Sequence, residues 1–239
     1  MSIENLRTGI DEIDSEIIRL LNRRCELARQ IGAWKHENNL PIYVPEREQQ
    51  LLDRLADHNP GPLDRDSLIA IYREIMSAAI KLEQPMNIAF LGPEGTFSHQ
   101  AVLEKFGRGV TCQPVPTIAD VFSAVEAGRA DYGMVPVENT TEGVVNPTLD
   151  SLTEANVRIV AEFNLPVHLL LYSASPLSEI RCVYSHQQPL GQCREYLRAN
   201  LPNATLIEVT STTRAVELAE RERDAAAISG KLAGDNTDL

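Results

Sequence analysis

The first 38 residues carry one long amphipathic repeat, which limits the possible folds more than any other feature of the chain. Apolar residues recur at intervals of three and four, at Ile3, Leu6, Ile10, Ile13, Ile17, Leu20, Leu27, Ile31 and Trp34. This spacing predicts one amphipathic α-helix that ends near Asn38 and Asn39. Such a helix extends roughly 50 Å, more than two short helices of the same chain can cover. We therefore expect a second copy of the chain to cover the rest.

Two shorter helices are predicted to complete an all-helical domain. Pro41 ends the first helix, and Pro45 fits the first turn of a second, where its missing N–H is not needed. The turn HNPGPLD follows, and Asp64 or Asp66 is expected to cap a third helix over residues 67–83. The expected buried stripe of the third helix consists of Leu68, Ile71, Ile75, Ala79 and Leu82.

The pattern changes after Gln84 and Pro85. Short apolar runs now alternate with helical stretches. The runs are NIAFLG, VTCQPV, ADYGMVPVE, VRIVAEF and VHLLLYS, and the helical stretches include SHQAVLEKFG and TIADVFSAVEAG. This alternation predicts an α/β domain with a largely parallel sheet. We expect two domains, at residues 1–85 and 86–239.

Composition excludes several classes of protein. With 22 Lys+Arg against 34 Asp+Glu, the formal charge of -12 argues against binding to nucleic acid or to anionic membranes. No apolar run reaches the roughly 20 residues of a membrane-spanning helix, and the N-terminus is too polar for a signal peptide, so we expect a cytoplasmic protein. The four cysteines show neither C-x-x-C pairing nor zinc spacing. We therefore expect buried core thiols, with neither a metal site nor disulfides.

An anionic ligand then needs a local cluster of cations, and the first helix offers one. Arg24 and Lys35 are eleven residues apart, close to three whole turns, so they share a face of the helix. Arg7 is roughly 25 Å from Arg24 along the axis, so it can join a common site only from another chain. Arg47, in the first turn of the second helix, is a fourth candidate. The alternative for each cation is a solvated helix face.

The sequences LRTGIDEID, RRCELARQIGAWK, PERE and LEQ, in this order, resemble the all-helical chorismate mutase family over residues 3–84. The resemblance implies a three-helix domain that forms an intertwined dimer. It also implies that Arg24, Lys35 and Arg47, with Arg7 of a second chain, bind the two carboxylates and the ether oxygen of chorismate. The Claisen rearrangement needs no nucleophile, metal or cofactor, and Lys35 is expected to donate to the ether oxygen.

The second donor to that oxygen is expected near the end of the third helix, where Glu83 and Gln84 compete. Glu83 lies closer to the apolar stripe, so we favour it. A carboxyl group donates a hydrogen bond only when protonated, which predicts mutase activity that falls as pH rises. Val44 and Ala79 depart from the family pattern at positions that contact substrate hydroxyls in some members.

The second half contains GPEGTFS, ADYGMVPVENTTEGVV, YSHQQPLGQC and STTRAVELA, and it resembles the prephenate dehydratase family over about 150 residues. The resemblance implies a two-lobed fold similar to periplasmic binding proteins, with prephenate between the lobes. Prephenate would lose water and carbon dioxide to give phenylpyruvate in phenylalanine biosynthesis. Matching the motifs residue by residue assigns site roles to Asn139, Ser185 and Gln192, whose side chains bind without titrating.

Three further residues of these motifs have two interpretations each. Ser211 and Thr212 are expected to cap the helix that follows them, with ligand binding as the second role. His186 is either a loop residue that orients the turn or a general acid.

The family's T-R-F motif and phenylalanine-sensing ACT domain are absent from the sequence, so the second domain is expected to be incomplete at its C-terminus. The alternatives are a mutase-only enzyme and an aromatic-acid binding module with an inactive dehydratase domain.

Overall fold

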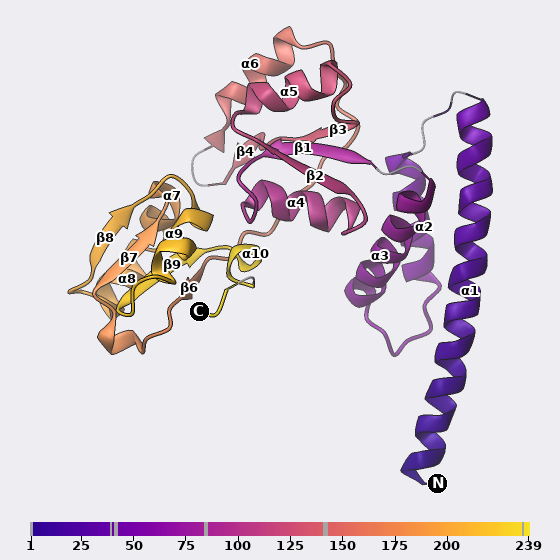
Figure 1. Cartoon of the computed structure of the whole chain (residues 1–239), viewed down its shortest axis with the longest axis horizontal. Helices are drawn as coiled ribbons and strands as arrows, with labels where there is room; N and C mark the ends of the chain where they lie inside the picture. Colours follow the sequence, from indigo (N-terminus) through magenta and orange to yellow (C-terminus); the bar gives the residue numbers. More distant parts are fainter. Residues whose placement is uncertain (1, 39, 41–42, 84–85, 141–142, 236) are drawn as a thin grey trace. The chain divides into compact units, whose positions relative to one another are not determined.

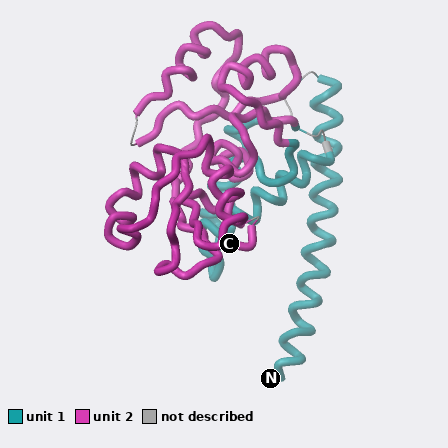
Figure 2. Tube along the Cα trace, turned by 60° about the vertical axis from the view of Figure 1, so that its left-hand side comes forward, with its two compact units in different colours: residues 1–86, 105–111 teal, residues 87–104, 112–239 magenta. Residues whose placement is uncertain are grey.

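The structure is a computed structural model that describes residues 2–38, 40, 43–83, 86–140, 143–235 and 237–239 (Figure 1). The chain forms two units, one comprising Met1–Met86 with Lys105–Thr111 and the other Asn87–Glu104 with Cys112–Leu239 (Figure 2). The predicted domain limit at Pro85 lies outside the described residues. A short segment from the middle of the chain thus belongs to the first, helical unit.

The helical unit consists of α1 (Ile3–Glu37), α2 (Pro45–Asp57) and α3 (Arg65–Glu83). Pro45 occupies the first turn of α2, as its missing N–H predicts. Of the two candidate caps for α3, Asp64 is the one used. Its carboxylate accepts the backbone N–H and the hydroxyl of Ser67 at 2.8 and 2.6 Å, and these bonds lower the pKa of Asp64. No helix in the described ranges is long and apolar enough to cross a membrane.

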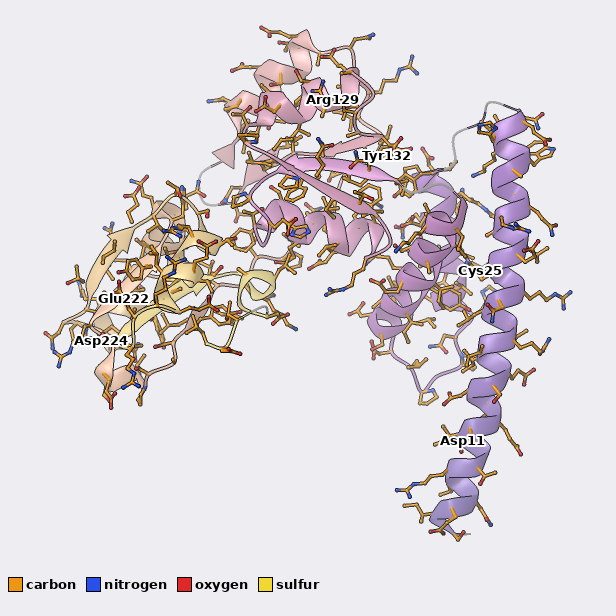
Figure 3. The ribbon with its side chains drawn as sticks, viewed as in Figure 1. Asp11, Cys25, Arg129, Tyr132, Glu222 and Asp224 are labelled. Carbon is orange, nitrogen blue, oxygen red and sulfur yellow. The ribbon has the colours of Figure 1, made fainter. Side chains whose placement is uncertain are left out.

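The apolar repeat of α1 is not the face that packs within the chain. The half-buried or buried face, which includes Cys25 (Figure 3), consists of Leu21, Arg24, Cys25, Ala28, Gly32 and Lys35. Ile13 and Trp34 of the apolar repeat are 59% and 57% exposed. On α3, Ala79 is buried as predicted, but Leu82 is 61% exposed. Both predicted stripes lie on helices. Within one chain, α1 contacts α3 along one side only, so parts of both stripes stay exposed.

The segment Lys105–Thr111 is fixed to α3 in the helical unit. The backbone N–H of Gly109 donates to the hydroxyl oxygen of Ser77 at 2.8 Å. A Cβ added at Gly109 would lie 2.5 Å from the backbone oxygen of Ser77, so only glycine permits this approach. The rings of Tyr43 and Phe106 are 5.2 Å apart and add an aromatic contact.

The α/β unit begins with a three-stranded sheet in the order β2-β1-β3. Its strands are β1 (Asn87–Leu91), β2 (Thr111–Val115) and β3 (Tyr132–Met134), and its helices are α4 (Phe97–Phe106), α5 (Ile118–Glu126) and α6 (Asn146–Glu154). β1 and β3 are parallel. α4 covers one face, and α5 and α6 lie on the other (Figure 1). A separate antiparallel pair joins β4 (Glu138–Asn139) to β5 (Gly143–Val144).

A second sheet has the order β6-β9-β7-β8, in which β7, β8 and β9 are parallel and β6 is antiparallel. Its strands are β6 (Leu170–Tyr172), β7 (Cys182–Ser185), β8 (Thr205–Glu208) and β9 (Ala225–Ser229). The helices beside it are η1 (Leu177–Glu179), α7 (Gln187–Gln192), α8 (Arg194–Asn200), α9 (Thr212–Ala219) and α10 (Lys231–Gly234). The parallel pairing confirms the predicted α/β class.

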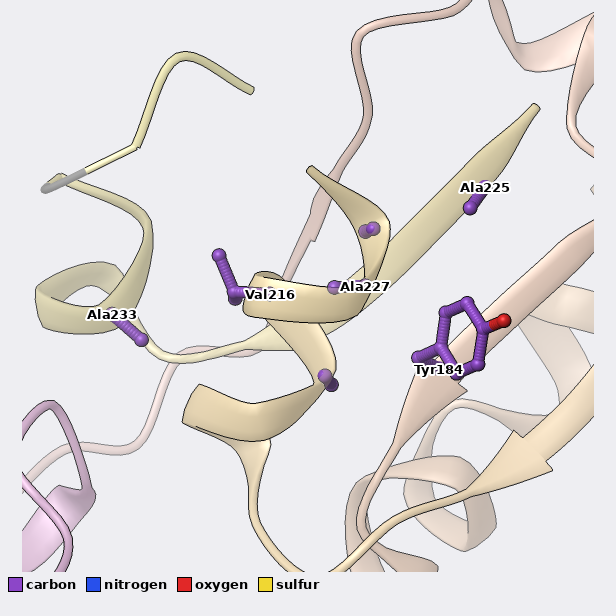
Figure 4. Packing of buried hydrophobic residues seen from close by; sticks show 7 residues of the cluster. Tyr184, Val216, Ala225, Ala227 and Ala233 are labelled. Carbon is purple, nitrogen blue, oxygen red and sulfur yellow. The ribbon is translucent and has the colours of Figure 1, made fainter. Parts of the chain in front are cut away.

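Alternate residues of β9 enter two hydrophobic clusters. Ala225 and Ala227 pack with Val216 of α9 (Figure 4), whereas Ala226 and Ile228 belong to a cluster with other partners. Because successive side chains of a strand point to opposite faces, β9 is covered on both sides. The second sheet therefore has a core on each face.

One predicted strand is wrong. The run VRIVAEF, residues 157–163, forms no strand in the structure. Ile159 is 75% exposed and Val160 is half exposed. A strand is stabilised by hydrogen bonds to a neighbouring strand, and the described part of either sheet does not pair with this run. The four cysteines are free thiols that are half-buried, so they are less buried than the core thiols expected from the sequence.

Candidate functional site

The first candidate site contains the cations of α1. Arg24 and Lys35 are both half-buried on the face of α1 that packs within the chain, so the predicted shared face is observed. The Nη1 atom of Arg24 is buried and has no hydrogen-bond partner among the residues that the structure describes. A buried charged donor without an acceptor is costly, so this nitrogen is suited to an anionic ligand.

The other predicted mutase residues are placed differently. Arg47 is exposed in the first turn of α2, and Arg7 is exposed near the start of α1. A single chain does not bring Arg7 to Arg24, because both lie on one straight helix roughly 25 Å apart along its axis. Glu83 is the last residue of α3. The side chain of Glu83 and all of Gln84 lie outside the described residues.

Glu48 is a half-buried acidic residue of the helical unit that the sequence did not single out. It follows Arg47 on α2. Burial raises the pKa of Glu48, and the charges of Lys105 and Arg73 and a hydrogen bond from Tyr43 act in the opposite direction. Glu48 is the last residue of the motif PERE, and this motif is the sequence feature that could have identified it.

The second candidate site lies where the parallel strands β7, β8 and β9 end. Ser185 is the last residue of β7, and its fully buried hydroxyl donates to the backbone oxygen of Ile228 at 2.7 Å. The next residue, His186, caps α7 and accepts the N–H of Gln188 at 3.5 Å, which favours its interpretation as a residue that orients the turn. Gln192 ends α7 and is exposed.

Ser211 is the N-cap of α9, as predicted. Its hydroxyl oxygen accepts the backbone N–H of Arg214 at 3.0 Å. Thr212, the first residue of α9, is buried. Asn139 belongs to the separate β4–β5 pair and is half-buried opposite Gly143. The structure therefore places Ser185 at the end of β7, and it places Ser211 and Thr212 at the start of α9 beside the same sheet. Asn139 belongs to the separate β4–β5 pair.

Loop 92–97 consists of the turn after β1 and the first residue of α4, Phe97, and it carries most of the motif GPEGTFS. It also contacts the elements of the second sheet. The hydroxyl of Thr213 donates to the backbone oxygen of Glu94 at 2.9 Å. A Cβ at Gly95 would lie 3.0 Å from the Thr213 hydroxyl oxygen, and a Cβ at Gly230 would lie 2.6 Å from the Phe97 ring. The loop therefore approaches α9 and the residue after β9 closely.

His99 holds this loop in place. Its Nδ1 atom accepts the backbone N–H of Gly95 at 3.0 Å. Its ring stacks on that of Phe90, with centroids 4.8 Å apart. His99 is thus a positioning residue for the loop. Within the described ranges, no cluster of His, Cys, Asp or Glu is arranged to hold a metal ion.

Comparisons with known proteins identify the families to which the two halves of the chain belong. Residues 88–239 match the prephenate dehydratase family, and residues 6–84 match chorismate mutase type II. The chain is 48% identical over 236 residues to the bifunctional chorismate mutase/prephenate dehydratase of Aquifex aeolicus. The aligned region covers 97% of this chain and 65% of that protein. The protein of the same name from Pseudomonas aeruginosa is 39% identical over 244 residues, covering 99% of this chain and 67% of that protein.

A solved structure supports the fold of the second half. The prephenate dehydratase of Arthrobacter aurescens, in complex with L-Phe, matches with a TM-score of 0.58 and 32% identity, covering 64% of this chain and 52% of that chain. A helical domain followed by this α/β domain defines a protein that joins a mutase-type and a dehydratase-type domain. The chain belongs to the bifunctional chorismate mutase/prephenate dehydratase family. It spans about 65% of the length of the Aquifex relative.

Proposed function

We propose that the helical unit converts chorismate to prephenate and that the α/β unit converts prephenate to phenylpyruvate, in the cytoplasm, as steps of phenylalanine biosynthesis. The observation that carries the proposal is the buried, unpartnered Nη1 of Arg24 on the same face of α1 as Lys35. A rearrangement without nucleophile, metal or cofactor depends on donors that fix the reactive conformer and stabilise charge on the ether oxygen. Two cations held on one helix face are suited to this task.

Each residue then has a distinct role in the mutase reaction. Arg24 and Arg47 bind the carboxylates of chorismate, and Lys35 donates to the ether oxygen. Glu83, when protonated, is the second donor to that oxygen. Arg7 completes the site from a second chain, because Arg24 of its own chain is out of its reach.

The proposed second chain is supported by the exposed face of α1. The apolar repeat from Ile3 to Trp34 includes large side chains that are about half exposed in one chain. An apolar stripe of this length is typical of a surface that another protein covers. A dimer that buries it would also bring Arg7 of one chain to Arg24 of the other.

In the α/β unit, Asn139 and Gln192 are proposed to donate amide hydrogens to prephenate. The Ser185 hydroxyl already donates its proton to Ile228, so it offers a ligand only its acceptor lone pairs. Thr212 and the cap Ser211 are proposed to contact the substrate from the start of α9. Their N–H groups and the helix dipole favour a carboxylate there.

Assays on the purified 239-residue chain test the proposal. Chorismate consumption and phenylpyruvate formation from prephenate are measured separately. For the mutase, Arg24→Ala is expected to lower kcat/KM by roughly a hundredfold or more. Arg23→Ala is the matched control, because it removes the same charge from the exposed neighbouring position. We expect this control to stay within about twofold of wild type.

The outcomes separate the alternatives. A chain that leaves chorismate unchanged refutes the mutase proposal, and equal losses in both arginine variants refute the role of Arg24. If prephenate binds but yields no phenylpyruvate, the α/β unit is a binding module. If prephenate neither binds nor reacts, only the mutase activity remains.

A further inference from the structure

Ser229, the last residue of β9, has a buried hydroxyl that no residue satisfies. Its side chain is fully buried, and its oxygen has no hydrogen-bond partner in the described part of the chain. Ser185 ends the neighbouring parallel strand and is equally buried, but its hydroxyl donates to Ile228. An unsatisfied buried hydroxyl is costly, so packing alone does not account for a serine at position 229.

The side chain of Ser229 lies on the face of the sheet that α9 covers. Ala225 and Ala227, on the same side of β9 by alternation, pack with Val216 of α9 (Figure 4). α9 connects the parallel strands β8 and β9, so it runs back along the sheet and begins at the carboxyl ends of the strands. The hydroxyl of Ser229 and the first turn of α9, at Thr212, therefore share one edge of the sheet.

The loop 92–97 reaches the same edge from the first sheet. The ring of Phe97 lies against Gly230, which directly follows Ser229. Thr213, in the first turn of α9, donates to the backbone oxygen of Glu94 in the loop. A hydroxyl donor, a helix N-terminus and a loop from the other sheet thus meet at one place, and the first two favour a carboxylate.

We propose that the Ser229 hydroxyl donates a hydrogen bond to a carboxylate oxygen of a small aromatic acid bound at the start of α9. This inference deepens the proposed function of the α/β unit and rests on it, with prephenate as the ligand. Because the hydroxyl is closed off from solvent, the ligand reaches it when the Phe97 ring moves away from Gly230. Ser229 is then a binding residue and contributes nothing to the stability of the fold.

The test compares stability and binding in Ser229→Ala. Removing an unpaired buried hydroxyl is expected to leave Tm unchanged or to raise it. Binding of prephenate, measured by titration calorimetry, is expected to weaken roughly tenfold to a hundredfold, because a hydrogen bond to a charged group is lost. Ser185→Ala is the comparison for stability and should lower Tm, since its hydroxyl is paired. Ser123→Ala, on the exposed side of α5, is the control for binding and should leave it unchanged.

Two results would overturn the inference alone. One is a Ser229→Ala protein that binds prephenate as tightly as wild type, and the other is a fall in Tm as large as that of Ser185→Ala. Wild-type protein that does not bind prephenate refutes the proposed function of the α/β unit together with this inference.

Discussion

Replacing Gly109 with alanine tests whether Lys105–Thr111 is part of the helical unit. The segment lies within residues 88–239, which match the dehydratase family, but it packs in the helical unit. An alanine Cβ would lie 2.5 Å from the backbone oxygen and 2.6 Å from the hydroxyl oxygen of Ser77. The backbone oxygen belongs to α3 and cannot rotate away. Such overpacking costs roughly 1–3 kcal/mol, and the lost Gly109–Ser77 hydrogen bond adds about 1 kcal/mol.

A destabilisation of about 2–4 kcal/mol is large for a unit of this size and should lower its Tm by roughly 10 °C or more. Trp34 is the only tryptophan of the chain and lies on α1, so its fluorescence follows the unfolding of the helical unit. Gly191→Ala is the control, because a Cβ there meets no atom within 4 Å. We expect Gly191→Ala to be neutral or slightly stabilising. If Gly109→Ala unfolds at the wild-type Tm, the close approach of this segment to α3 is wrong.

Three further predictions concern the helical unit. Glu83→Gln should flatten the pH profile of the mutase reaction, because glutamine donates a hydrogen bond at every pH; identical profiles for the two proteins would remove Glu83 from the site. Ile13→Glu, in the exposed apolar repeat, should convert a dimer to a 26.5 kDa monomer in analytical ultracentrifugation and abolish mutase activity, whereas Glu12→Gln should do neither. A dimer that persists in Ile13→Glu would exclude this face as the interface. Glu48→Gln should gain stability relative to wild type as pH rises. The folded chain holds the Glu48 proton more tightly than the unfolded chain, so this contribution to stability is present below the ordinary pKa of 4.5 and is lost above it. Urea unfolding at low and neutral pH measures the difference, and a pH-independent difference would contradict the buried environment of Glu48.

The sequence determined the features that depend on neighbours along the chain. The three-four spacing fixed α1 almost to its last residue, and Pro45 marked the start of α2. The cap Ser211 was also predicted from its place before a helix. Helix periodicity, proline and caps act within about one turn, so they can be recognised in a sequence without knowledge of the fold. The α/β class could also be predicted, because the alternation of strands and helices is visible along the sequence.

The candidate sites were predictable where a motif carried them. The shared face of Arg24 and Lys35 follows from helix geometry, because eleven residues correspond to three turns. The burial of Arg24 and its unpartnered nitrogen did not follow, since both depend on how α3 packs against α1. The assignments of Asn139, Ser185 and Gln192 came from family resemblance, and they stay predictions.

Only the tertiary structure decided which surfaces meet. It showed that α1 turns its apolar repeat outward in one chain, that residues 157–163 form no strand, and that Lys105–Thr111 packs in the helical unit. It also brought loop 92–97 to Thr213 across more than a hundred residues of sequence, and it left the Ser229 hydroxyl without a partner. Local patterns specify the faces of an element, whereas contacts between distant segments depend on the packing of the whole chain.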